Sequence, residues 1–272
     1  MTKQKEKKEI IFDLVSIHEN FLRAKNLTPS PNIDSSFSKL VTLVDTTSKS
    51  NSKKILTHKK IHTLKKDFLR FSSQGESELE FFWAHKIIKS KNPHNTLLKF
   101  PYLKNYEDLV NFETEHLTKV GLYTKKSILF IGSGPLPLSP IFMAKKYNVS
   151  IDTIDIDKNA CTISRKILNV LKINQKINIY NEDVFNITDF SNYDVIFVAA
   201  LVGKTEKEKN SLIKHITKHA TQNTYLILRS VSDLGALLYP EVSSKCLKNI
   251  NVIKKTKRQK GIINNIIIGK IK

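Results

Sequence analysis

The sequence contains few cysteines, few glycines and no long hydrophobic segment. Cys161 and Cys246 are the two cysteines among 272 residues, too few for a disulfide framework or a Cys-based zinc site, as is usual in a reducing compartment. No apolar run reaches the roughly 18 to 20 residues that cross a bilayer, so we expect no contact with a membrane. Residues 1–9 are charged and lack the apolar segment of a secretory signal. We therefore expect a folded cytoplasmic protein.

Arginine is scarce as well, although the chain is strongly basic. Its formal net charge is +20, with 45 Lys and Arg against 25 Asp and Glu, a balance common in nucleic-acid-binding proteins. Only five of the basic residues are arginines, whereas proteins that bind phosphates and base edges favour the bidentate Arg fork. We therefore interpret the charge as a solvated, lysine-rich surface and expect no nucleic-acid partner. A non-enzymatic RNA-binding module is the alternative.

The hydrophobic pattern changes near residue 124. From Ile10 to about Leu122 apolar residues recur at helical spacing and only two glycines occur, which predicts a helical bundle. From Ser127 onward, short apolar strands alternate with helical stretches. We therefore predict two domains, a helical one over residues 1–123 and an α/β one over residues 124–272. The helices expected in the first domain cover residues 10–24, 37–44, 61–71, 76–90 and 106–120.

The second region has the strand and helix order of a doubly wound fold. Regular alternation of strands and helices predicts a mostly parallel sheet with helices on both faces. The last two expected strands, 251–254 and 262–269, are separated by a basic turn without a helix, which predicts a terminal hairpin and one antiparallel strand. The other expected strands cover residues 127–131, 150–155, 177–180, 193–199 and 224–228, with helices over 139–146 and 159–171.

A glycine turn and two aspartates follow the first three expected strands. Gly132-Ser133-Gly134 connects a buried strand to a helix, where glycine lets the backbone approach a ligand. Asp155 ends the next strand, ~20 residues later, where a carboxylate can accept both ribose hydroxyls. Asp183 follows the third strand and is placed to meet an adenine amino group. Without a ligand, the glycines would simply form a tight turn.

These features suit a nucleoside with a short charged tail. The third glycine of a dinucleotide fingerprint would fall at Pro137, which disfavours a pyrophosphate. S-adenosylmethionine fits the pattern. The expected fold class is therefore a Rossmann-like S-adenosylmethionine-dependent methyltransferase fold, with an antiparallel terminal strand and a preceding N-terminal helical bundle. The neighbouring Asp157 is expected to cap the following helix.

Several longer strings resemble the nicotianamine synthase family. This resemblance implies transfer of the 3-amino-3-carboxypropyl (aminobutyrate) group of S-adenosylmethionine to an amine, with release of 5′-methylthioadenosine. It also implies that the helical domain caps the active site. The strings are GESELE at 75–80, FPYLKNY at 100–106, FIGSGPLPLSP at 130–140, DVIFVAALVG at 194–203, and Arg229-Ser230 followed by Leu-Tyr-Pro at 238–240.

The same resemblance implies roles for individual residues. The family's catalytic glutamate falls on Glu80, and Tyr106 matches a site residue that would orient the amine or relay its proton. Without the resemblance, Glu80 would be the solvated start of a helix and Tyr106 a core aromatic. Substrate-binding positions are implied for Glu76, Glu113 and Arg229. Cofactor-binding positions are implied for Gly132, Ser133, Gly134, Pro135, Asp155, Asp183, Ala200 and Leu201.

One departure from the plant members concerns the acceptor. Asp233 and Gly235 stand where plant members carry Gly and Arg, so a cation that would hold an acceptor carboxylate is missing. This argues against the repeated condensation that makes nicotianamine. The chain resembles instead the bacterial staphylopine-pathway members, which make a single transfer to D-histidine. Nicotianamine synthesis proper and ordinary methyl transfer are the alternatives.

The resemblance also implies the partners. The product would pass to an opine-type dehydrogenase and become a metallophore. The sequence leaves the oligomeric state open, with a homodimer as one option. We expect no metal cofactor, because no His-Glu-x-x-His or Cys-paired spacing occurs. The histidines examined for such spacing are His58, His62, His85, His94 and His116.

Overall fold

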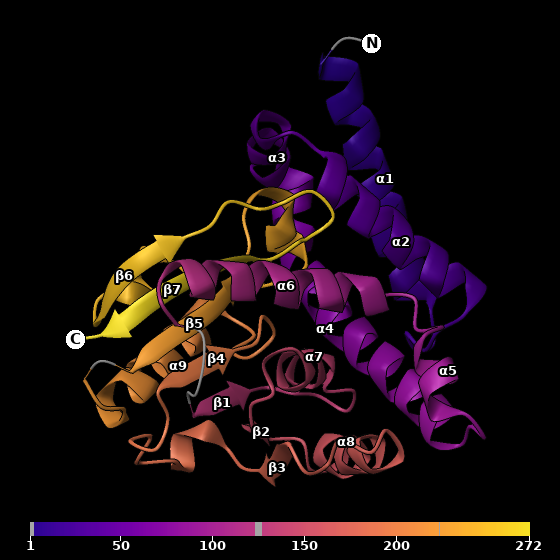
Figure 1. Cartoon of the computed structure of the whole chain (residues 1–272). Helices are drawn as coiled ribbons and strands as arrows, with labels where there is room; N and C mark the ends of the chain where they lie inside the picture. Colours follow the sequence, from indigo (N-terminus) through magenta and orange to yellow (C-terminus); the bar gives the residue numbers. More distant parts are fainter. Residues whose placement is uncertain (1–2, 123–126, 223) are drawn as a thin grey trace.

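An all-helical region precedes a seven-stranded sheet in the computed structural model, which describes residues 3–122, 127–222 and 224–272 (Figure 1). The predicted α/β fold with an N-terminal helical region is confirmed. Proline begins two of the N-terminal helices, where its fixed φ suits the first turn. The helices of this region are α1 (Lys3–Arg23), α2 (Pro31–Thr46), α3 (Lys49–Leu56), α4 (Lys59–Ile88), α5 (Pro93–Leu97) and α6 (Leu103–Lys119).

The helix α4 corrects the sequence prediction, which expected two helices, 61–71 and 76–90. It continues for 30 residues through Gly75, although an interior glycine costs roughly 1 kcal/mol relative to alanine. A Cβ at Gly75 would lie 2.1 Å from the Phe37 ring. The glycine therefore makes room for the Phe37 ring of α2, a contact that local sequence patterns do not show. The short helices α3 and α5 were not predicted.

The sheet has the order β3-β2-β1-β4-β5-β7-β6. Parallel pairing runs from β3 to β5, and β7 is antiparallel to both of its neighbours, which confirms the predicted terminal hairpin. Strand order reverses beside β1, and ligands of open α/β sheets bind at such a switch point. The strands are β1 (Ile128–Ile131), β2 (Ile151–Asp155), β3 (Ile177–Asn181), β4 (Val195–Val198), β5 (Tyr225–Ser230), β6 (Ile250–Lys255) and β7 (Asn265–Ile271).

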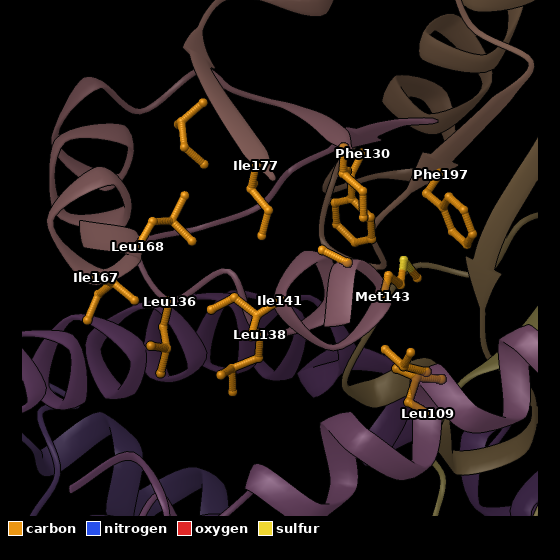
Figure 2. Close-up of a cluster of buried hydrophobic side chains, with 14 of the residues drawn as sticks. Leu109, Phe130, Leu136, Leu138, Ile141, Met143, Ile167, Leu168, Ile177 and Phe197 are labelled. Carbon is orange, nitrogen blue, oxygen red and sulfur yellow. The ribbon is translucent and has the colours of Figure 1, made fainter. Parts of the chain in front are cut away.

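Both faces of the sheet are covered by apolar side chains. On one face Phe130 and Phe197 pack with residues of α7 (Leu138–Tyr147) and α8 (Lys158–Val170), as Figure 2 shows. Leu109 of α6 and Ala84 of α4 belong to the same buried cluster. On the other face the strands pack against α9 (Glu206–His219). Each fully buried large aliphatic side chain contributes about 1.5–3 kcal/mol, so the shared cluster fixes α4 and α6 relative to the sheet.

Three short 3₁₀ turns complete the described chain. They are η1 (Val184–Asn186), η2 (Asp233–Leu237) and η3 (Ser244–Leu247). The turn η2 contributes Leu234 and Leu237 to a third buried cluster, together with Phe68 of α4 and residues of α1 and α2. This cluster joins the segment after β5 to the N-terminal helices. Elements distant in sequence therefore meet at the carboxyl edge of the sheet.

Candidate active site

A cavity of about 920 Å³ lies where these elements meet. Its walls come from α2, α4 and α6, from the segments that follow β1 to β4, and from residues 261–264. Small-molecule pockets usually measure about 300–1,000 Å³, so this cavity has room for two reactants. Every predicted cofactor-binding residue lines it.

The glycine turn forms one wall of the cavity. Gly132 and Gly134 have φ values of +84° and +65°, a left-handed conformation that side chains other than glycine rarely adopt. A Cβ at Gly132 would lie 2.2 Å from Val202 Cγ2, and one at Gly134 would lie 2.5 Å from Glu80 Oε2. The two glycines therefore allow close approach of the loop after β4 on one side and of α4 on the other.

Asp155 holds this turn from the neighbouring strand. Its Oδ2 accepts a hydrogen bond of 2.8 Å from the Gly134 backbone N–H, and its Oδ1 accepts one of 3.0 Å from the Asp157 N–H. Each carboxylate oxygen has a further lone pair that can accept a hydroxyl. Asp157 caps α8 through the N–H groups of Asn159 and Ala160, as expected.

Two further polar groups lie at this end of the cavity. Asp183 caps η1 by accepting from the Phe185 N–H at 3.0 Å, which leaves its other oxygen for a ligand. The Ser133 hydroxyl is buried and has no hydrogen-bond partner among the described residues. An unsatisfied buried hydroxyl costs about 1–3 kcal/mol. A polar ligand group at the turn would remove this cost.

Two carboxylates and two tyrosines form a hydrogen-bonded group in the middle of the cavity. Tyr106 Oη lies 2.7 Å from Glu80 Oε1 and 3.3 Å from Glu76 Oε1. Tyr239 Oη donates to Glu76 Oε2 at 2.9 Å. Glu76 and Glu80 are one helical turn apart on α4, so both side chains face the same side. The sequence motifs included Tyr239 within Leu-Tyr-Pro, but no role was predicted for it.

The environment of this group raises the affinity of both carboxylates for protons. Burial raises the pKa of Glu80 well above its ordinary value, and the adjacent Glu76 raises it further. Desolvation also raises the pKa of Glu76, against the hydrogen bonds from Tyr239 and Tyr106. Burial and the two carboxylates raise the pKa of Tyr106, so its hydroxyl remains a donor. A carboxylate with a raised pKa is suited to accept a proton near neutral pH.

Arg229 reaches the cavity from the end of β5. Its Nε and Nη2 donate to the Glu113 carboxylate at 2.7 and 3.0 Å, and Nη2 also donates to Ser139 Oγ at 2.8 Å. Burial opposes the charge, but Glu113 raises the pKa of Arg229 above its ordinary value. Nη1 has no protein partner among the described residues and can bind a ligand carboxylate.

Glu113 lies behind Arg229 rather than on the cavity wall. Its side chain is completely buried, and it is absent from the residues that line the cavity. This placement differs from the substrate contact that the resemblance implied. The bidentate pairing fixes the arginine and engages both oxygens of the glutamate.

Asp233 and Gly235 also lie outside the cavity wall. Asp233 has φ +56°, a conformation that favours the glycine of plant members. A Cβ at Gly235 would lie 3.1 Å from Val231 Cβ and 3.8 Å from Ile263 Cγ2. Ile263 lines the cavity, so a long side chain at position 235 would have to pass it to reach a substrate.

Lys209 is a buried cation that sequence reasoning missed. Its side chain is 1% exposed, and its ammonium donates to the carbonyls of Ala200 at 2.6 Å and Val202 at 2.9 Å. Desolvation lowers its pKa to about 8. It lies on α9 among many solvated lysines, and nothing in the sequence distinguishes it from them.

The charge of the cavity is opposite to that of the whole protein. Two basic side chains line it, those of Lys204 and Arg229, although the chain has an excess of 20 positive charges. A cleft lined by one sign of charge attracts ligands of the other, so this cavity favours a cation. Its acidic lining residues are Asp34, Glu76, Glu80, Asp155, Asp157, Glu182, Asp183 and Glu208.

Across residues 3–122, 127–222 and 224–272, no three His, Cys, Asp or Glu side chains form a group able to hold a metal ion. Over the same ranges, every helix is too short or too polar to cross a membrane.

Comparison with known proteins identifies relatives over nearly the whole chain. A family model described as "Nicotianamine synthase protein" matches residues 2–272. Nicotianamine synthase 1 of Arabidopsis thaliana is 28% identical over 268 residues, which cover 96% of this chain and 83% of the relative. Nicotianamine synthase of Solanum lycopersicum is 28% identical over 265 residues, with the same coverage of 96% and 83%.

Solved structures show the same fold. The crystal structure of MtNAS in complex with MTA and tNA has a TM-score of 0.85 at 20% identity, covering 100% of this chain and 99% of MtNAS. An MtNAS variant in complex with S-adenosylmethionine has a TM-score of 0.83 at 19% identity, covering 96% and 97%. With the family match over residues 2–272, these findings show that the chain belongs to the nicotianamine synthase family of S-adenosylmethionine-dependent aminobutyrate transferases.

Proposed function

We propose that this protein transfers one aminobutyrate group from S-adenosylmethionine to the amine of D-histidine and releases 5′-methylthioadenosine. The observation that carries the proposal is the Glu80–Tyr106 pair. It lies against Gly134 on one side and Glu76 on the other, between the proposed nucleoside end of the cavity and the rest of its volume. Residues 1–123 would form a domain that caps this site.

The residues at the glycine turn fit S-adenosylmethionine. Asp155 would accept the ribose hydroxyls and Asp183 the adenine amino group. The buried Ser133 hydroxyl would form a hydrogen bond with the amino acid portion of S-adenosylmethionine. Pro135, Ala200 and Leu201 would pack against its nucleoside. The acidic cavity suits both the sulfonium charge and the charge of an incoming amine.

The bound co-substrate supplies a carbon that is activated by the sulfonium. The acceptor nitrogen lone pair forms the new C–N bond, while the C–S bond breaks and its electron pair stays on the sulfur as a neutral thioether. Glu80 takes the proton that the amine must lose, because an ammonium has no lone pair with which to attack. Tyr106 holds the Glu80 carboxylate at 2.7 Å and fixes its direction.

The single-transfer proposal is supported by the scarcity of cations in the cavity. Arg229 has its Nη1 group available, because Glu113 and Ser139 already accept hydrogen bonds from Nε and Nη2. The complex for a single transfer already holds two carboxylates, those of S-adenosylmethionine and D-histidine, and each further aminobutyrate unit would add another that needs a cation. Burying a carboxylate without a partner is costly. The product of one transfer would then serve an opine-type dehydrogenase.

Nicotianamine synthesis proper is the second candidate, because the plant relatives that cover 96% of the chain carry that name. Mass spectrometry of the products separates the two. We expect S-adenosylmethionine with D-histidine to give methylthioadenosine and a singly alkylated histidine. A nicotianamine mass from S-adenosylmethionine alone would establish the second candidate, preference for L-histidine would correct the chirality, and S-adenosylhomocysteine would indicate methyl transfer.

Replacing Asp155 with alanine should weaken S-adenosylmethionine binding by about 1–3 kcal/mol, because charge-assisted hydrogen bonds to the ribose would be lost. Calorimetric titration measures the effect. Asp152→Ala is the matched control on the same strand, since Asp152 bonds Tyr193 and Asn178 and does not line the cavity. Equal affinities of the two variants would place the ribose elsewhere.

A further inference from the structure

We propose that Lys209 is a positioning residue for S-adenosylmethionine, holding the loop of residues 199–203 against the glycine turn. The inference rests on the proposed function, because it assumes that this part of the cavity binds the nucleoside. Lys209 itself touches no ligand in this arrangement. It acts through the backbone of the loop.

The loop is seated on the turn by close packing. Val202 Cγ2 lies 2.2 Å from the place that a Cβ of Gly132 would occupy, so the loop uses the space that this glycine leaves. At the other end, Gly203 has φ +76°, and its Cβ would lie 2.9 Å from the Lys209 Cα and N. The loop is therefore packed between the turn and the first turns of α9.

The ammonium fixes the direction of the loop backbone. The ammonium donates a hydrogen bond of 2.6 Å to the Ala200 carbonyl and one of 2.9 Å to the Val202 carbonyl. These carbonyls point toward α9, so the opposite side of the loop faces the cavity that it lines. Among the described residues Lys209 forms no ion pair with a carboxylate. The two carbonyl oxygens are its hydrogen-bond partners, which makes loop positioning its main contribution.

Burying a charged side chain costs free energy. Desolvation of an ammonium costs several kcal/mol unless hydrogen bonds replace its water, and an apolar side chain of similar volume would avoid this cost. The buried charge is explained by the two hydrogen bonds that it donates, because the two backbone carbonyls that accept them are turned away from water. Without it, they would have to rotate toward solvent and take the loop with them.

The test compares Lys209→Met, which removes both donors at similar volume, with Lys209→Gln, which retains an amide donor. Lys214→Met on the exposed face of α9 is the matched control. We expect the dissociation constant for S-adenosylmethionine to rise on the order of tenfold in Lys209→Met and less in Lys209→Gln. The control should bind like the wild type. The KM for S-adenosylmethionine should rise similarly, while kcat and the KM for the acceptor change little.

The outcomes distinguish this inference from the proposed function. Failure of the wild type to bind S-adenosylmethionine would overturn the proposed function. A wild type that binds, together with Lys209→Met and Lys209→Gln variants that bind equally well but melt earlier, would show that Lys209 acts on stability alone and overturn the inference. If Lys209→Met does not fold, Lys209→Gln still decides. Its amide is uncharged and one bond shorter than the ammonium, so a smaller but measurable loss of affinity is expected, and affinity equal to that of the wild type contradicts the role.

Discussion

Glu80→Gln should lower turnover by about 10²- to 10⁴-fold, the usual contribution of a general base. Glutamine keeps the size of the side chain and can still bond Tyr106, but it cannot accept the amine proton. Binding of S-adenosylmethionine should persist, because the residues proposed to bind it lie at or after the carboxyl ends of β1 to β4 and none lies on α4. Steady-state kinetics and calorimetric titration on the same samples measure both quantities.

Glu78→Gln is the control for this prediction. Glu78 lies on the same helix but is bonded to Thr28 and Gln74, so its loss should leave turnover near the wild-type level. If Glu76→Gln abolishes turnover while Glu80→Gln retains most of it, the proton acceptor is Glu76 and the assignment within the pair must be exchanged.

The raised pKa of Glu80 predicts how turnover and thermal stability depend on pH. Wild-type turnover should rise with pH as the Glu76–Glu80 pair loses its proton, and the Glu80→Gln defect should shrink at high pH, where more of the amine is already neutral. A carboxyl group whose pKa is higher in the folded state stabilises the fold below its unfolded pKa, and this stability is lost as pH rises through the folded pKa. Glu80→Gln should therefore melt at a higher temperature than the wild type at pH 8.

Glu113→Gln should destabilise the protein by about 3–5 kcal/mol, because it leaves a buried guanidinium without its counter-charge. Denaturant unfolding followed by circular dichroism measures this. Glu115→Gln is the control on the same helix, since Glu115 forms an exposed pair with Lys119, and it should change little. A small effect of Glu113→Gln would mean that water reaches Arg229 and replaces the carboxylate.

A double variant separates stability from binding. Replacing both Glu113 with Leu and Arg229 with Met removes the charges together, which often restores or increases stability. We expect such a protein to fold well and to have a raised KM for a substrate carboxylate. Recovery of both stability and normal KM would show that Arg229 does not contact substrate.

The features that were predictable from sequence are local ones. Five short apolar segments specify the parallel strands β1 to β5. The signal is strongest in the central strands β1 and β4, whose residues are all apolar and nearly all buried. The link from Gly134 to Asp155 follows from the same logic, since carboxyl ends of adjacent parallel strands meet at one edge of the sheet. The final hairpin was predictable because no helix separates its strands.

The features that were not predictable depend on contacts between distant segments. Glu113 and Arg229 are 116 residues apart, and neither local sequence shows that the carboxylate turns away from the cavity. The need for glycine at position 75, inside α4, comes from the Phe37 ring of another helix. The burial of Lys209 depends on the carbonyl directions of a loop that has no sequence signature.

Gly134 has a consequence for how this fold diversifies. The sulfonium of S-adenosylmethionine activates three carbons, and the enzyme determines which of them the nucleophile reaches. In this protein the carboxylate of Glu80 occupies the space of the absent Cβ of Gly134, so the distance between the base and the turn is set by a missing methyl group. A side chain at Gly134 would strain the turn, where φ is +65°, and would push the end of the Glu80 side chain aside. The alignment of the proposed base with one of the three sulfonium carbons therefore depends on glycine at this position.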